Sequence, residues 1–385
     1  MRRPSLRVAG FACFSLAVYL VVRSFVDPAM IDFAIYRIEG DAIRNGISLY
    51  SHLDTPQGFQ ATYPPFAGIV FVPISLIPWL ASQILANVVN IALIWLVSWQ
   101  SCRLVRVPEH RMPDVALLVA AVSIWAEPVY TTLGNGQINL VLLALVLSDF
   151  LRRDDSLWRG VGIGIAIGIK VTPGVFVLYL LLARRFRMAV TAVATFAVTL
   201  AVSAAVVPAD TWRFWSKILF DTSRVGQLAN STNQSVQGLL ARATRSIELA
   251  SGWALLAGVV ALAALGVAVF AYYRLGDLWG LPVAAVAGLL GSPIAWTHHW
   301  VWCIPITVLL VTRLRPWSPI VLIFWTFALF YFQHKAPQVV RFPDWKLALT
   351  QWYVLFGVVF VLLALVIARR TTPVDTPTHA TENPP

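Results

Sequence analysis

The most constraining feature of this chain is a succession of apolar runs, most of them about 18 to 25 residues long, which is the length of a helix that crosses a bilayer. Hydrophobic residues make up 58% of the 385 residues and charged residues only 12%, against about 45–50% and about 25% in soluble globular proteins. This balance excludes a soluble enzyme, a disordered protein and a collagen-like fibre. The runs are also longer than the roughly ten-residue alternating strands of an outer-membrane barrel. The sequence therefore predicts an all-α polytopic membrane protein.

The apolar runs lie at about 8–26, 64–81, 82–104, 113–133, 137–151, 160–183, 187–207, 251–273, 278–292, 299–314, 317–333 and 346–368. From these runs we expect about 11 to 13 transmembrane or re-entrant helices in one integral membrane domain, residues 1–370. The tail 371–385 is rich in Thr and Pro and lacks core-forming residues. We therefore expect this tail to be disordered and to lie in the cytoplasm.

Basic residues predict the orientation, because cytoplasmic loops of membrane proteins collect Lys and Arg. Three arginines precede the first run and no small-residue cleavage site follows it, which favours a retained helix with its N-terminus inside. The inner linkers contain Arg152, Arg153, Arg159, Arg184, Arg185, Arg187, Arg274, Arg313, Arg315, Arg369 and Arg370. This alternation places 27–63, 208–250, the segment from Ser292 to His299 and 334–346 outside. Much of the net charge of +11 is thus topological, and it does not indicate nucleic-acid binding.

Two regions do not fit a simple alternation. The run 160–183 lies between two basic linkers and contains Lys170 and Pro173, so we expect two half-helices that meet there. Broken helices occur in membrane proteins where the break lines a cavity. The region 64–104 is split at Pro78, and one of its two runs is a candidate re-entrant segment.

The outer segment 27–63 contains the first group of polar residues beside the membrane. Apolar residues recur at helical spacing over 31–45, which predicts a helix along the interface. Asp32 near its start is either a helix-capping carboxylate or a base that takes a proton from a sugar hydroxyl. Tyr36 and Tyr63 are either interface anchors or residues that stack on a sugar.

Two further polar groups interrupt apolar runs. Asn135, Gln137 and Asn139 lie between the runs 113–133 and 137–151; an ordinary outer turn explains the first, but amides inside a bilayer are costly without a partner. Lys170 stands about ten residues into its run, where a charge needs an anion. Its candidate partners are Asp32, Asp149 and a substrate phosphate.

The outer side also carries an amide pair and a histidine pair. Asn233 and Gln234 lie in the loop 208–250 with Arg213, Lys217, Arg224, Arg242 and Arg245. A polar loop with a helix cap explains the amides, but so basic an outer loop is suited to an anionic lipid headgroup. His298 and His299 follow Trp296; adjacent residues of a helix diverge by about 100 degrees, so they rarely bind one metal ion together. We expect a hydrogen bond from one of them to a phosphate, and no metal or other cofactor.

These motifs together resemble glycosyltransferase family 87, the actinobacterial polyprenyl-phosphate-mannose-dependent α-1,2-mannosyltransferases of GT-C architecture. The resemblance covers about residues 20–335 and rests on the order and spacing of several short motifs. They are Asp32-x-x-x-Tyr36, Gly46 to Tyr50, Tyr63-Pro64-Pro65, Gly134-x-Gly136-Gln137-x-Asn139, Lys170-x-Thr172-Pro173, Asn233-Gln234-Ser235, and Ser292-Pro293 with His298 and His299.

The resemblance implies a mechanism, a location and a set of residues that bind the substrate or the donor. These residues are Tyr36, Tyr63, Asn135, Gln137, Asn139, Lys170, Asn233, Gln234, Trp296, His298 and His299. Asp32 would deprotonate a hydroxyl of a glycolipid acceptor, either a phosphatidylinositol mannoside or a lipoglycan. That hydroxyl would attack mannose with inversion and form an α-1,2 linkage. Polyprenyl phosphate would leave, stabilised by Lys170, by His298 or His299, and by an outer-loop arginine. The active site would lie on the outer (periplasmic) face of the plasma membrane, formed by outer-side loops.

Several alternatives remain open at the level of sequence. Asp27, Asp41 and Asp54 are alternative acids for the role of base. A polyprenyl-phosphate-arabinose donor satisfies the same residues as the mannose donor. A lipid or sugar transporter, or a flippase, shares the many helices, the break at Lys170 and the basic outer loop; long outer loops and the absence of visible repeats disfavour it. The sequence does not indicate an oligomeric state.

Overall fold

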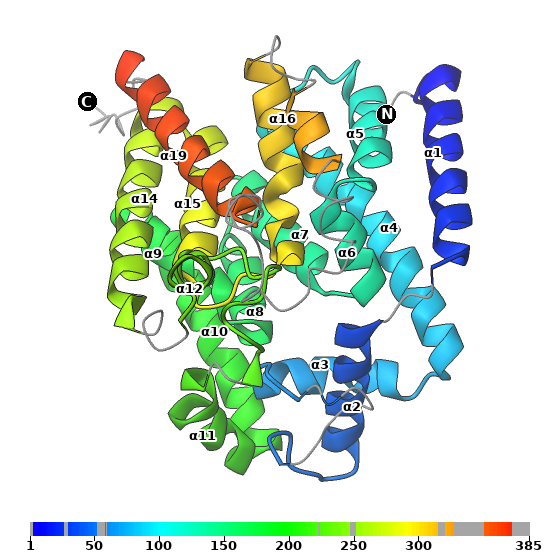
Figure 1. The fold of residues 1–385 in the computed structure, drawn as a ribbon, viewed down its shortest axis with the longest axis vertical. Coiled ribbons are helices and arrows are strands. Elements are labelled where there is room, and N and C mark those ends of the chain that lie inside the picture. The colour runs from blue at the N-terminus through cyan, green and yellow to red at the C-terminus, as the bar shows by residue number, and fades with distance from the viewer. Residues whose placement is uncertain are drawn as a thin grey trace, which may run out of the picture.

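The computed structural model describes residues 3–26, 30–51, 58, 60–221, 224–246, 252–314, 320–326 and 350–371. Within these residues the secondary structure is helical, apart from one isolated β-bridge between Asn233 and Trp296. This confirms the predicted all-α class. In Figure 1 α1 (Leu6–Ser24) begins and α19 (Trp352–Arg370) ends at the top, whereas α2 (Ile31–Arg44) lies at the bottom.

The first run of the chain forms α1, and the helix predicted at 31–45 is α2. The next two helices are α3 (Pro65–Ser75) and α4 (Trp79–Leu104), separated as predicted at Pro78. With 11 residues, α3 is too short to cross a bilayer as a helix. It packs against α2 where Gly40 approaches closely, because a Cβ atom on Gly40 would lie 2.4 Å from the carbonyl oxygen of Phe71.

The run 113–133, expected as one helix, is bent. It consists of α5 (Met112–Ser123) and α6 (Glu127–Asn135), whose axes differ by 71°. Pro128 stands in the first turn of α6, where its missing N–H is tolerated, but it cannot continue the hydrogen bonds of α5. The bend turns α6 toward the middle of the molecule, beside η4 (Thr297–Trp302). The sequence did not predict this bend.

The predicted break in the run 160–183 is confirmed. The helix α8 (Val161–Ile169) ends at Lys170, whose backbone is extended at φ −150° and ψ 129°. The short helix η1 (Thr172–Gly174) and α9 (Val175–Leu182) follow. Gly162 and Gly164 let α8 pack tightly, because a Cβ atom would lie 2.5 Å from a carbonyl oxygen of α7 (Asn139–Leu151) or α10 (Phe186–Val206) respectively. The break therefore lies among packed helices.

The remaining described helices complete the bundle. They are α11 (Pro208–Ser216), η2 (Ile218–Phe220), α12 (Val236–Thr244), α14 (Ala254–Leu275), α15 (Asp277–Gly291) and α16 (Cys303–Arg313). In Figure 1 α11 lies at the bottom near α3, at the same end as α2. Parts of two segments predicted as outer loops, α2 and α11, thus lie at the end opposite to the start of α1 and the end of α19.

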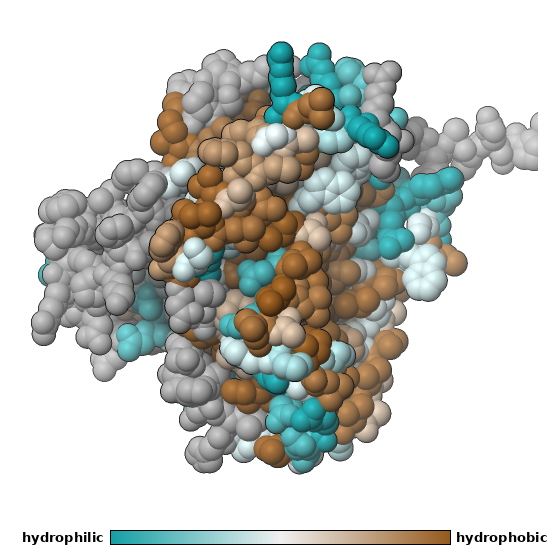
Figure 2. Space-filling model, turned by 90° about the vertical axis from the view of Figure 1, so that its right-hand side faces the viewer, coloured by the Kyte–Doolittle hydropathy of each residue, from teal (hydrophilic) through white to brown (hydrophobic). Residues whose placement is uncertain are grey.

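The helices are long and apolar enough for a multi-pass membrane protein. Five of those described qualify as spans on length and composition: α1, α4, α10, α14 and α19. The bent pair α5–α6 makes a sixth when taken as one span. Figure 2 shows one face, where hydrophobic side chains cover most of the middle and hydrophilic ones gather toward the top and bottom. The predicted segment 334–346, the tail beyond Thr371 and most of the run 317–333 lie outside the described residues.

Candidate active site

A cavity of about 770 Å³ opens between the end of the molecule that holds α2 and α11 and the middle of the bundle. Its wall is polar where α2, the turn after α6 and the break at Lys170 meet, and apolar along α9, α14 and α15. The lining includes Asp32, Thr62, Tyr63, Asn135, Gln137, Lys170, Thr172, Arg224, Ser292, Trp296, His298 and His299 on the polar side, and Val175, Leu178, Ala261, Leu262, Leu265, Ala287 and Gly288 on the apolar side.

Asp32 lies in the first turn of α2 and faces this cavity. The start of α2 is fixed by a 3.0 Å hydrogen bond from the backbone N–H of Met30 to the carbonyl oxygen of Gly134. A helix N-terminus stabilises a carboxylate. Burial nevertheless raises the pKa of Asp32 to about 6, while the positive charge of Lys170 and the amides of Gln137 and Asn135 act in the opposite direction. A carboxyl with this pKa is ionised at neutral pH and still able to accept a proton.

Two tyrosines and Gln137 form a hydrogen-bonded group beside Asp32. The hydroxyls of Tyr36 and Tyr63 are 2.9 Å apart, and the Tyr36 hydroxyl donates to Oε1 of Gln137 over 2.9 Å. Oε1 of Gln137 also accepts from the Tyr63 hydroxyl over 3.4 Å. Because this oxygen accepts both bonds, the amide nitrogen of Gln137 is left for the Asp32 carboxylate. Gly136 permits this arrangement: its φ is 66°, and a Cβ atom there would lie 2.6 Å from Cβ of Phe33. The turn after α6 is therefore pressed against the first turn of α2.

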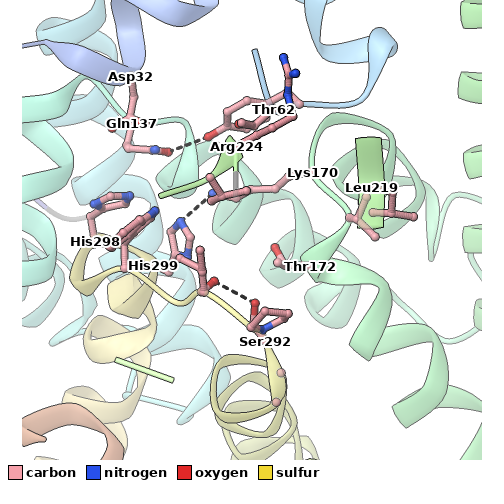
Figure 3. A pocket seen from close by; sticks show the side chains of 18 of the residues that line it. Asp32, Thr62, Gln137, Lys170, Thr172, Leu219, Arg224, Ser292, His298 and His299 are labelled. Carbon is pink, nitrogen blue, oxygen red and sulfur yellow. Dashed lines mark hydrogen bonds between the residues drawn. The ribbon is translucent and has the colours of Figure 1, made fainter. Parts of the chain in front are cut away.

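Lys170 lies across the same cavity and contacts two predicted site residues. Its Nζ is 3.1 Å from Oδ1 of Asn139 and 3.0 Å from Nε2 of His299; the latter bond is drawn in Figure 3. A Lys ammonium has only donors, so Nε2 of His299 accepts and His299 is neutral. The amide nitrogen of Asn139 donates to the carbonyl oxygen of His298 over 2.9 Å. Asn139 therefore links the break in α8–α9 to η4.

The two histidines differ in how their ring nitrogens are used. Nε2 of His299 is held by Lys170, whereas Nε2 of His298 is buried and has no hydrogen-bond partner among the described residues. Both residues line the cavity, and their rings lie edge to face with centroids 4.8 Å apart. His298 is thus the histidine with a ring nitrogen left for a ligand.

The structure does not bring all predicted residues to the cavity wall. Tyr36 and Asn139 lie one layer behind it and orient residues that do line it. The side chain of Asn233 accepts from the Ala295 N–H over 2.9 Å, and Nε2 of Gln234 donates to the Thr350 carbonyl over 2.6 Å. Both amides are fully buried and hold the chain around Trp296 and the start of α19.

The basic residues of the predicted outer loop occupy different positions relative to the cavity. Of Arg213, Lys217, Arg224, Arg242 and Arg245, the cavity wall includes Arg224. Arg242 is fully buried, and its guanidinium donates to the Asn230 and Asn233 carbonyls at 2.6 and 2.7 Å and to Oε1 of Gln351 at 2.7 Å. Charge in the sequence gave no signal that distinguishes these two arginines.

Two buried carboxyl groups near the site, those of Glu39 and Glu127, were not predicted from the sequence. Glu39 lies on the face of α2 that carries Asp32 and Tyr36, and burial raises its pKa to about 8. Glu127 begins α6; its carboxylate accepts from the hydroxyls of Tyr353 (2.6 Å) and Thr131 (2.8 Å). The helical spacing of residues 32, 36 and 39 is the signal that would have identified Glu39.

The chain was compared with known proteins. The sequence model of glycosyltransferase family 87 matches residues 61–294. A polyprenol-phosphate-mannose-dependent alpha-(1-2)-phosphatidylinositol mannoside mannosyltransferase of Mycobacterium tuberculosis is 32% identical over 376 residues, with 90% of this chain and 87% of the relative covered. A polyprenol-phosphate-mannose-dependent alpha-(1-2)-phosphatidylinositol pentamannoside mannosyltransferase of Mycolicibacterium smegmatis is 36% identical over 293 residues, with 73% and 69% covered. No solved structure matches the chain.

Proposed function

The chain belongs to glycosyltransferase family 87, and we propose that it transfers mannose from polyprenyl-phosphate-mannose to a phosphatidylinositol mannoside or related lipoglycan. The names of its relatives support this donor, acceptor and α-1,2 linkage. We further propose that the reaction takes place on the outer face of the plasma membrane, because the cavity lies near the segments that the distribution of charge assigns to the outside.

The proposed general base is Asp32. Its carboxylate takes the proton of an acceptor hydroxyl, the hydroxyl oxygen forms a bond to the anomeric carbon of mannose, and the bond from that carbon to the phosphate oxygen breaks. One displacement inverts the anomeric centre. The observation that carries this role is the position of Asp32 at the cavity wall, with Gln137, Asn135 and Lys170 around it.

The alternative acids of the same segment have less support. Asp41 lies nine residues after Asp32 on α2, has a 47% exposed side chain and pairs with Arg44 over 2.7 Å. It does not line the cavity. Asp27 and Asp54 lie outside the described residues.

The leaving group is polyprenyl phosphate, and the cavity offers it cationic and polar groups. Lys170 supplies a positive charge, and the unpartnered Nε2 of His298 supplies a further hydrogen-bonding atom. Preorganised donors aimed at developing negative charge are a large source of catalysis. We therefore assign Lys170 and His298 to the departing phosphate, with His299 and Asn139 orienting Lys170.

The apolar side of the cavity suits a lipid-linked donor. Leu178 of α9 and Leu262 of α14 line the cavity and are 51% and 65% exposed. Small residues of α15, among them Ala287 and Gly288, continue this side inward. An isoprenoid chain buries its own apolar surface against such side chains while its phosphate stays at the polar side.

The test is transfer by membranes that contain the wild type or the Asp32→Asn variant, offered labelled polyprenyl-phosphate-mannose or polyprenyl-phosphate-arabinose. General-base catalysis contributes about 10²- to 10⁴-fold, so transfer should fall by about that factor. Asp41→Asn, on the same helix, is the matched control and should keep its activity. Undiminished transfer by Asp32→Asn excludes Asp32 as the base, and transfer of arabinose in place of mannose overturns the proposed donor.

A further inference from the structure

Arg224 is a cavity-lining cation whose hydrogen-bonding capacity is left unused. It follows η2, is half-buried and belongs to the cavity wall. Its Nε and Nη2 atoms are shielded from solvent and have no hydrogen-bond partner among the described residues. Leaving charged donors buried without a partner is costly. An anion bound beside Arg224 would supply the acceptors that these two nitrogen atoms lack.

The two unused atoms belong to one edge of the guanidinium group. Nε–H and the adjacent N–H of Nη2 point in parallel, which is the fork geometry that binds two oxygens of a phosphate or carboxylate at once. A Lys ammonium, such as that of Lys170, has no comparable fixed edge. The free edge of Arg224 thus fits a tetrahedral oxyanion better than a single polar oxygen.

Arg224 lies near Tyr50 in the wall of the same cavity that Lys170 lines. The hydroxyl of Tyr50 donates to the carbonyl oxygen of Tyr63 over 2.6 Å. Burial raises the pKa of Tyr50, and the positive charge of Arg224 opposes that rise. Arg224 therefore lies near Tyr50, and Figure 3 draws it by Thr62. Lys170 is bonded to His299, and its Nζ lies over the ring of Tyr63, 5.4 Å from the ring centroid.

The other arginines near this loop are used differently. Arg242 donates from Nη1 to two backbone carbonyls and from Nη2 to Gln351, as described above. Arg213 lies on the exposed side of α11 and does not line the cavity. The free edge of Arg224 is therefore not a general property of a basic loop.

We propose that Arg224 binds a phosphate group of a lipid substrate through its Nε–Nη2 edge, as an anion-binding group in addition to Lys170 and His298. The proposal rests on the proposed function for the identity of the lipids. Two phosphates have the required chemistry: the phosphate of the polyprenyl donor, and the phosphodiester of an inositol-lipid acceptor.

The test compares Arg224→Ala and Arg224→Gln with Arg213→Ala in the purified full-length protein in lipid nanodiscs. Mannose transfer is measured with a phosphatidylinositol mannoside acceptor and with an uncharged alkyl α-mannoside acceptor, with each substrate varied in turn. Removal of a charge-assisted hydrogen-bonding group should raise one KM by about 10- to 100-fold, with a smaller change in kcat. Arg213→Ala should match the wild type.

The pattern of KM values identifies the source of the phosphate. A higher KM for the donor with both acceptors assigns Arg224 to the donor phosphate. A higher KM for the inositol lipid, with the alkyl mannoside unaffected, assigns it to the acceptor phosphodiester. Unchanged KM values for both substrates in a folded Arg224→Gln protein overturn the proposal.

Binding provides a readout that does not depend on transfer. Thermal shifts of the wild type by farnesyl phosphate and by phosphatidylinositol should include one that is lost in Arg224→Gln and kept in Arg213→Ala. If the wild type transfers no mannose, the proposed function fails while this measurement still tests Arg224. Equal shifts in wild type and Arg224→Gln for both lipids contradict a phosphate site at Arg224.

Discussion

The charged residues at one end of the bundle and those around the cavity are paired to different degrees. At the end predicted to face the cytoplasm, Nη1 of Arg185 bonds both carboxylate oxygens of Asp277 at 2.8 Å. The carboxylate of Asp149 accepts from the Ile163 N–H at 2.7 Å and thereby caps α8. Around the cavity, by contrast, Asp32 has no ion pair within 4.0 Å among the described residues.

This difference separates groups that hold the helices together from groups that await a ligand. A buried charge is costly unless it is paired and hydrogen-bonded. The Arg185–Asp277 pair meets this requirement within the protein and joins α10 to α15. Lys170, His298 and Arg224 meet it only in part, and a phosphate and a sugar supply the missing partners in our account.

After loss of the Asp32 carboxylate, loss of the Lys170 ammonium should have the largest effect on kcat. Lys170→Ala takes away a charge aimed at the leaving phosphate, so kcat for mannose transfer should fall by about 10²- to 10³-fold. The measurement is steady-state transfer by purified protein, after size-exclusion chromatography confirms folding. A kcat within about threefold of the wild type, in a variant that elutes normally, would show that Lys170 does not act on the leaving group.

Removing the ion pair between Arg185 and Asp277 should lower the stability of the protein and leave its rate of mannose transfer unchanged. Arg185→Ala strands the carboxylate of Asp277, which is 21% exposed, and removal of one partner of a buried pair costs about 3 kcal/mol. We expect a lower unfolding midpoint in thermal or denaturant unfolding. The kcat of the folded fraction should remain near that of the wild type. A large loss of kcat without loss of stability would contradict the proposed difference between the Arg185–Asp277 pair and the charged groups of the cavity.

The helices were predictable where length and spacing alone decide them. The break at Lys170 followed from a charge and a proline inside one apolar run, and α2 followed from its helical periodicity. The bend at Glu127 was missed, because the run around Pro128 is long enough for one helix and the partner that stabilises the bend, Tyr353, is 226 residues away.

Only those site residues that belong to short sequence motifs were predictable from the sequence. Asp32, Gln137 and Lys170 were identified and do line one cavity. Asn233 and Gln234 were assigned to the donor, but their amides bind the backbone, which no local pattern reveals. Arg224 and Arg242 are indistinguishable in sequence; their roles differ because tertiary packing supplies acceptors to one and leaves an edge of the other free.

Whether Asp32 acts as a base within a cavity whose charges are incompletely paired can be measured from the pH dependence of kcat/KM for mannose transfer. The base must be unprotonated, and burial raises the pKa of Asp32 to about 6. Activity should therefore be constant above that pH and fall about tenfold per unit below it. The Asp32→Asn variant should lose this acidic limb along with its activity. A kcat/KM that is constant between pH 5 and 7, or an acidic limb that persists in the residual activity of Asp32→Asn, would contradict the account.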